Sequence, residues 1–239
     1  MTFNINSTKE SIVDKVSKLS HLIVKESPDI VFLSELSYAN KPYLDSILVK
    51  HYPYHRMYDW HCFYSKYPLS KKIELKNNHN EAIGVFKYKA IIGTDTLILY
   101  GCHFASNNYS SNADYITPDS IKSRNKLIQY LYDIELAYSI REKEAMALCD
   151  DIPTSFEKII VLGDFNDVGG STTIGLLEDA GLKDVWWCGG VGYGATIHKP
   201  LPYRIDHILY SNQFKLNRVK VVGSDELSDH DAVFAEFSY

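Results

Sequence analysis

Three apolar runs in this chain each lead into a polar side chain, and this recurrence restricts the fold more than any other feature. Residues 159–162 are followed by Gly163 and Asp164. Runs of the same kind precede Glu35 and His103. Continuous β-branched and apolar runs are typical of strands that are buried on both faces. Because open α/β sheets place their chemistry at the carboxyl ends of strands, the pattern predicts an α/β fold with a site at these ends.

Helices are predicted between the strands. A Ser-x-x-Glu capping box begins a helix over residues 7–26, in which apolar residues recur at threes and fours. A Thr-Pro-Asp start begins a longer helix over residues 117–148. Ser171 is expected to cap a short helix that ends at Gly181. The order helix, strand, hairpin occurs once before Phe104 and once after it, which indicates two halves of similar architecture.

The remaining strands follow from period-two patterns and turn residues. They are expected at residues 82–88, 90–101, 203–210, 219–222 and 227–237, with a turn at residues 93–95. In residues 203–210, strand alternation places Arg204 and Asp206 on one face. Residues 71–80 are polar and are predicted to form a loop, as is the glycine-rich stretch 189–194.

Composition and charge leave the function open. A chain of 239 residues with 45% hydrophobic and 23% charged residues is predicted to form one domain, residues 1–239. The net charge of −5 and the pI near 6.0 argue against a surface that coats nucleic acid, but not against a local basic cleft or a bound metal. The cysteines include no Cys-x-x-Cys pair, so no zinc site is expected.

The ends of the chain bear on its origin. No apolar run approaches the ~18 residues that a membrane-spanning helix needs, and residues 1–26 do not show a basic segment followed by a hydrophobic one. We therefore expect a soluble domain and a monomer. Residues 1–5 already resemble part of a strand, which suits a domain excised from a longer chain, for example a secreted or envelope-tethered bacterial protein. The compartment stays open.

Three local features have both a functional and an ordinary interpretation. In an extended backbone Asp164 and Asn166 point to one face and Phe165 points into the core, so the pair can bind a hard cation, orient a water or contact a phosphate. Asp and Asn are also common turn residues. A carboxylate such as Glu35 after an apolar run must be solvated, paired or bound to a cation. The aromatic stretch 51–68 suits base stacking, or equally the rim of a core.

Taken together and in chain order, short segments of this sequence resemble the endonuclease/exonuclease/phosphatase superfamily of DNase I-like, metal-dependent phosphoesterases. The segments are Phe3-Asn4-Ile5, Phe32-Leu33-Ser34-Glu35, His103, Gly163-Asp164-Phe165-Asn166, Arg204-Ile205-Asp206-His207 and Ser228-Asp229-His230. The resemblance spans the chain. It implies an α/β (α+β) fold, a four-layer α/β/β/α sandwich in which two mixed β-sheets pack face to face with helices outside.

The resemblance also implies the roles of individual residues. Glu35 is similar to the principal Mg²⁺ or Mn²⁺ ligand of the family, and Asn4 and Asp229 resemble supporting metal ligands. The implied catalytic residues are His103, Asp164, Asn166, Asp206 and His230. In that scheme His230 contacts the scissile phosphate and Asp206 orients the His230 side chain. Asn166 and Arg204 bind substrate.

The resemblance does not select one branch of the superfamily. Asp167 stands where inositol phosphatases would have an aromatic residue. The first hypothesis is divalent-metal-dependent hydrolysis of phosphate esters, with a phosphodiesterase or nuclease acting on nucleic acid preferred. The alternatives are a phosphatase or phospholipase-like hydrolase of sugar-phosphate or lipid head groups, and a catalytically silent binding module. A basic groove beside Glu35 would favour nucleic acid, and an exposed apolar loop there would favour lipid.

Overall fold

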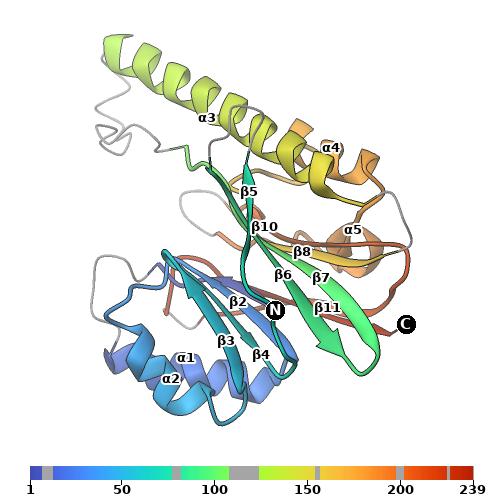
Figure 1. Cartoon of the computed structure of the whole chain (residues 1–239). Coiled ribbons are helices and arrows are strands. Elements are labelled where there is room, and N and C mark those ends of the chain that lie inside the picture. Colours follow the sequence, from blue (N-terminus) through green and yellow to red (C-terminus); the bar gives the residue numbers. More distant parts are fainter. Residues whose placement is uncertain are drawn as a thin grey trace.

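A computed structural model describes residues 1–6, 13–76, 82–107, 124–153, 157–197, 202–224 and 227–238 of the chain (Figure 1). The capping box predicted at Ser7 and the helix start predicted at residues 117–119 lie outside these ranges. Within the described ranges, no helix combines the length and apolar character that a membrane crossing requires.

Two six-stranded mixed sheets form the centre of the fold. The first runs in the order β11 (Lys215–Val222), β12 (Ala232–Ser238), β1 (Thr2–Asn4), β2 (Ile30–Ser34), β4 (His61–Ser65), β3 (Tyr54–Tyr58). The second runs in the order β5 (Ile73–Lys76), β6 (Ala82–Ile92), β7 (Asp95–His103), β8 (Lys158–Asp164), β10 (Asp206–Tyr210), β9 (Lys183–Asp184).

The two sheets have the same plan. In each, one parallel pair lies at the centre, β1 with β2 and β7 with β8, and the other neighbours are antiparallel. A helix joins the two strands of each parallel pair, because parallel neighbours need a crossover connection. These helices are α1 (Val13–Glu26) and α3 (Arg124–Asp151). The predicted recurrence of helix, strand and hairpin is therefore present.

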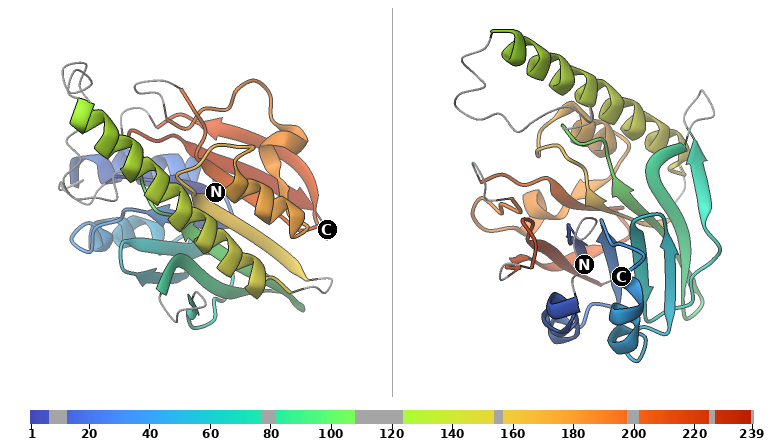
Figure 2. Two further views of the ribbon diagram at one scale, coloured as in Figure 1. Left: turned by 90° about the horizontal axis from the view of Figure 1, so that it is seen from above. Right: turned by 90° about the vertical axis from the view of Figure 1, so that its left-hand side faces the viewer.

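Helices cover both outer faces of the sheet pair. Helix α1 and helix α2 (Lys41–Leu48) lie on the first sheet, and α3 and α4 (Thr172–Asp179) lie on the second (Figures 1 and 2). The buried side chains form three clusters that correspond to the three interfaces between four layers. Strand alternation explains the division, since Leu33 faces α1 and α2 while Phe32 faces the other sheet. The predicted four-layer sandwich is confirmed.

Several local predictions were wrong. Part of the predicted loop at residues 71–80 forms the edge strand β5, because its backbone pairs with β6 and its alternating Ile73 and Leu75 provide an apolar face, with Leu75 buried. Residues 90–92 belong to β6, which begins at Ala82 and continues up to the turn at Gly93. Helix α5 (Val185–Gly189) was not anticipated at the start of the glycine-rich stretch, where the side chain of Asp184 caps the Trp186 amide. Ser171 caps α4 as predicted.

Candidate active site

Strand ends from both sheets meet at one edge of the sandwich. Asn4 lies opposite Ser34 at the ends of β1 and β2, and His103 lies opposite Asp164 at the ends of β7 and β8. Asp206 begins the antiparallel strand β10 and also pairs with Asp164. The predicted convergence of polar side chains at carboxyl strand ends is therefore present.

One buried amide joins the acidic groups of the two sheets. The Asn4 Nδ2 atom donates to Glu35 Oε1 and to Asp164 Oδ2, both at 2.9 Å. The Asn4 side chain is 1% exposed, so this link is sheltered from water. Asp164 is buried and Glu35 is partly exposed, and two carboxylates held this close repel each other unless positive charge lies between or beside them. The arrangement is therefore suited to a cation or to a cationic side chain.

Two of the site residues have left-handed backbone conformations. Glu35 has φ of 56° and Asn166 has φ of 50°. For a residue other than glycine such a conformation costs ~1–2 kcal/mol, and Asn tolerates it best. In both cases the residue lies within two positions of the end of a strand, β2 for Glu35 and β8 for Asn166. Such strain is retained where the surrounding structure imposes it, which is common at functional sites.

The turn at Asn166 differs from the extended backbone that we predicted there. Strand β8 ends at Asp164, whose Oδ1 atom accepts a hydrogen bond from the Asn166 backbone amide at 2.8 Å. The Asn166 Nδ2 atom donates to the Phe104 carbonyl at 2.9 Å, which ties this turn to the end of β7. Phe165 is fully buried, as predicted. Asp164 and Asn166 are thus brought together by a side-chain-capped turn rather than by strand alternation.

His230 and Asp206 form a charged pair. The His230 Nδ1 atom lies 2.8 Å from Asp206 Oδ2, and its Nε2 atom lies 3.8 Å from Asp164 Oδ2. Burial by itself lowers the pKa of His230, but the charge and hydrogen bond of Asp206, followed by the charges of Asp164 and Asp229, outweigh burial and raise that pKa to about 10. His230 is therefore protonated at neutral pH and presents an N–H to the interior of the site.

A second histidine pair lies on the opposite side of the acidic groups. The His103 Nε2 atom is 3.5 Å from Glu35 Oε1, and its Nδ1 atom is 3.0 Å from Nε2 of His61. Burial, and next the charge of His103, lower the pKa of His61 to about 3. His61 is neutral at neutral pH, so this pair is held by a hydrogen bond between imidazoles. Sequence reasoning missed His61, whose only signal was its place within the aromatic stretch 51–68.

Asp229 and Arg204 occupy positions that the sequence did not indicate. Asp229 is exposed, and its Oδ1 atom accepts from Asn6 Nδ2 at 2.9 Å. Arg204 is buried against Asp184 Oδ2 at 2.8 Å and His207 Nδ1 at 2.6 Å. The predicted common face of Arg204 and Asp206 is wrong, because the strand begins only at Asp206. Arg204 thus contributes to a buried network behind the site rather than to the acidic cluster.

Two groups of side chains within the described ranges have donor atoms close enough to hold a metal ion. They are Glu35, His103 and Asp164, and Asp164, Asp206 and His230, each with donor atoms within 4.8 Å of one another. In the second group the protonated His230 already compensates Asp206. The first group has two carboxylates bridged by a neutral amide, and hard divalent ions prefer oxygen ligands. The donor set around Glu35 therefore fits such an ion better.

Comparison with known proteins identifies the family of the chain. The sequence profile of the Endonuclease/Exonuclease/phosphatase family matches residues 1–230. The chain belongs to this family. Membership in the endonuclease/exonuclease/phosphatase family supports phosphoesterase activity. No protein of curated function matches the chain.

Solved structures share the fold at low sequence identity. Humanized D. rerio TDP2 has 16% identity and a TM-score of 0.71, covering 100% of this chain and 97% of that one. The 3' phosphatase NExo from Neisseria has 16% identity and a TM-score of 0.67, covering 100% and 98%. Staphylococcus aureus beta toxin has 17% identity and a TM-score of 0.64, covering 98% of each chain. At these identities the likeness shows the DNase I-like fold alone.

Proposed function

We propose that this chain is a divalent-metal-dependent phosphodiesterase that acts on nucleic acid. The observation that carries the proposal is the Asn4 amide that bridges Glu35 and Asp164, with the protonated His230 beside Asp164. The family match over residues 1–230 supports a single catalytic domain for residues 1–239.

Glu35 would hold Mg²⁺ or Mn²⁺, with Asn4 next to it and Asp229, exposed and hydrogen-bonded to Asn6, in a supporting position that stays a prediction. Such an ion neutralises charge on the phosphoryl oxygens and polarises the phosphorus centre. Asn4 keeps Glu35 oriented, because the Asn4 amide donates a hydrogen bond to one of its carboxylate oxygens, Oε1.

The chain's own residues then divide the remaining work. Asp164 accepts a proton from the attacking water or fixes its orientation, and Asn166 offers its amide to a phosphoryl oxygen. One Asn166 N–H bond is used by Phe104, which fixes the plane of the amide. His230 donates its Nε2–H to a phosphoryl oxygen, while Asp206 keeps the imidazole charged and correctly turned. His103 faces the substrate from the Glu35 side and can supply a proton to the leaving oxygen.

The preference for a nucleic-acid diester has narrower support. Exposed Tyr58 and Trp60 lie beside Glu35, in a position to contact a substrate strand. Among the similar structures, TDP2 has been solved with a single-strand DNA product and NExo with a product DNA hairpin. Two alternatives remain open to test. The first is a phosphatase or phospholipase-like hydrolase of sugar-phosphate or lipid head groups, and the second is a catalytically silent binding module.

The test is hydrolysis of bis-p-nitrophenyl phosphate and p-nitrophenyl phosphate by the purified chain, with and without Mg²⁺ or Mn²⁺. We expect metal-dependent release from the diester that Glu35→Gln removes. Glu135→Gln, on the exposed side of α3, is the matched control and should retain full activity. Preference for the monoester would assign a phosphatase. Absence of release from both compounds, or metal-independent release that Glu35→Gln leaves unchanged, would contradict the proposal.

A further inference from the structure

A pocket of about 460 Å³ adjoins the site on the Glu35 side. Its walls include Trp60, Tyr58, Phe86 and Ile83, and its inner end is formed by Glu35 and His103. Another cavity, of about 440 Å³, lies at the opposite edge of the sheets between Met1 and Phe237 and contains none of the site residues. Any group that enters the first pocket is therefore within reach of a phosphate held at Glu35.

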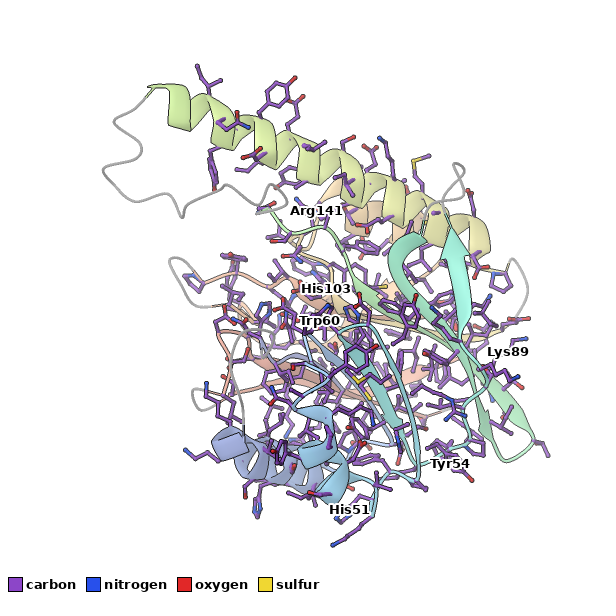
Figure 3. The ribbon with its side chains drawn as sticks, turned by 60° about the vertical axis from the view of Figure 1, so that its left-hand side comes forward. His51, Tyr54, Trp60, Lys89, His103 and Arg141 are labelled. Carbon is purple, nitrogen blue, oxygen red and sulfur yellow. The ribbon has the colours of Figure 1, made fainter. Side chains whose placement is uncertain are left out.

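The β3–β4 hairpin holds Trp60 in this pocket. Tyr58 pairs with His61, so Asp59 and Trp60 form the turn, and Asp59 has φ of 52° as a tight turn requires. The Trp60 carbonyl accepts a hydrogen bond from the Leu36 amide at 2.8 Å, one residue after Glu35. The Trp60 backbone is therefore held next to Glu35, and Figure 3 shows the Trp60 side chain next to His103.

The pocket presents aromatic surface to solvent rather than a closed core. Trp60 is 39% exposed, and its ring is supported by Tyr38 at 6.5 Å between centroids. The floor is the buried Phe86, which packs on His61 at 4.5 Å and on Tyr58 at 5.7 Å. The rings are tilted with respect to one another, so the part-exposed Trp60 indole is the surface on which a base can stack, and every nucleobase has a face that can stack.

Two side chains of opposite charge, Lys72 and Asp59, lie at the pocket wall that Tyr58 forms. The Lys72 ammonium lies over the Tyr58 ring, 2.8 Å from its centroid. A second cation on these aromatic faces would be repelled by this ammonium. The exposed Asp59 carboxylate lies close by in the same wall. A carboxylate acceptor and an ammonium donor together match the mixed donors and acceptors on the edge of a base.

We propose that this Trp60 pocket binds an unstacked nucleobase of the nucleotide that carries the scissile phosphate, so that the enzyme acts on single-stranded or frayed nucleic acid. The inference rests on the proposed function, because it places the base relative to a phosphate at Glu35. A base inside a duplex cannot reach the pocket unless it leaves its stack, which costs a few kcal/mol.

The catalytic test is a cycle of protein and substrate changes. Hydrolysis of a thymidine dinucleotide is compared with hydrolysis of two analogues, in each of which one base is replaced by hydrogen. We expect Trp60→Ala to lower kcat/KM on the dinucleotide about tenfold or more. On the analogue that lacks the base bound by Trp60, the same substitution should lower kcat/KM much less, so the two losses do not multiply. Trp60→Phe, which keeps a ring, should stay within about threefold of wild type.

Tyr54→Ala is the matched control. Tyr54 is 37% exposed and lies at the other end of β3, far from His103 in Figure 3. Equal losses on all three substrates with Trp60→Ala would mean that Trp60 shapes the site without contacting a base, and this would overturn the proposal. So would unchanged kcat/KM on the dinucleotide.

A binding measurement separates the pocket from the chemistry. Quenching of tryptophan fluorescence by the dinucleotide is followed in buffer with a chelator, in wild type and in Trp60→Phe. We expect quenching in wild type that Trp60→Phe removes, because Trp186 and Trp187 lie outside the pocket. Base-dependent quenching without any turnover would keep the pocket and reject the proposed function. Turnover without such quenching would keep the proposed function and reject the base pocket. Quenching by phosphocholine but not by the dinucleotide would assign the pocket to a cationic head group.

Discussion

The two histidine pairs of the site differ in charge although they occupy similar places. His230 is backed by the buried Asp206 carboxylate, and its pKa is raised to about 10. His103 is backed by the neutral imidazole of His61, whose pKa is lowered to about 3, chiefly by burial. His61 and Asp206 begin equivalent strands, β4 and β10, in two sheets of the same plan. One backbone arrangement thus places the cationic His230 on one side of Glu35 and Asp164, the cationic side, and the neutral His61 behind His103 on the other, the neutral side.

The difference shows how a repeated architecture acquires distinct roles. A phosphate diester bears negative charge where it is attacked, so a permanent cation is useful on one side. On the other side the neutral His61 adds no positive charge that would compete with a metal ion at Glu35. The following predictions test this division, in order of decreasing effect on turnover.

The largest loss is expected when the charged side is removed. His230→Ala and Asp164→Asn should each lower kcat by about 10²-fold or more with the fold intact, because they remove groups that contact the reacting phosphate or water. The rate of diester hydrolysis and the circular dichroism spectrum check this. His51→Ala changes an exposed histidine far from the site and is the control (Figure 3). Near-wild-type rates in both site variants would disprove the assignment.

Removing only the carboxylate behind His230 should cost less. Asp206→Asn keeps the shape and a hydrogen-bond partner but removes the charge that holds the proton on His230. We expect a loss of about 10- to 100-fold, the range found for residues that orient a catalytic group. Asp29→Asn, an exposed carboxylate, serves as control. A rate equal to wild type would show that the charge of His230 does not matter for turnover.

The neutral side should respond more weakly. His61→Gln retains hydrogen-bonding capacity but changes the group that orients His103, and we expect a loss of about tenfold in kcat. His55→Gln is the matched control, since His55 is half-buried on β3 and its pKa is also lowered, mainly by burial. If His61→Gln lost as much activity as His230→Ala, the neutral side would be as important as the charged one.

Much of this site follows from local sequence patterns. Apolar runs that end in Glu35, His103 and Asp164 are strands because burial on both faces demands such runs, and parallel strands bring their ends together. His61 could not be recognised from the sequence. Its role depends on the pairing of β4 with β2 and on its contact with His103 of the opposite sheet. The direction of the Arg204 side chain depends on where β10 begins. That start is set by long-range hydrogen bonds to β8, which the local sequence does not show.

The smallest effect on turnover is expected for the buried network behind the site. Burial by itself raises the pKa of Asp184, but the hydrogen bond and charge of His207, with those of Arg204, lower it to about 2 from its ordinary value of 3.8. Because the folded-state pKa lies below the unfolded one, this carboxylate contributes about 2 kcal/mol of stability above pH ~4, which is lost as the pH falls through about 2.

Asp184→Asn should therefore destabilise the fold at neutral pH while changing kcat little. Removing one partner of a buried ion pair costs ~3 kcal/mol or more. The urea midpoint at pH 7 and at pH 2.5 checks this, with Asp179→Asn, an exposed carboxylate on α4, as control. The difference in urea midpoint between wild type and Asp184→Asn should be smaller at pH 2.5 than at pH 7. A gap that stays constant would show that the pair does not act through charge.

The charge difference between the two pairs is tested most directly by the ¹⁵N chemical shifts of the histidine ring nitrogens at pH 7.5, with and without saturating Mg²⁺. Assignment uses the spectra of His230→Ala and His61→Gln. The structure predicts that both ring nitrogens of His230 carry protons and that His61 is neutral with one protonated nitrogen. A neutral His230, or a protonated His61, would contradict the division of the site into a cationic side and a neutral side.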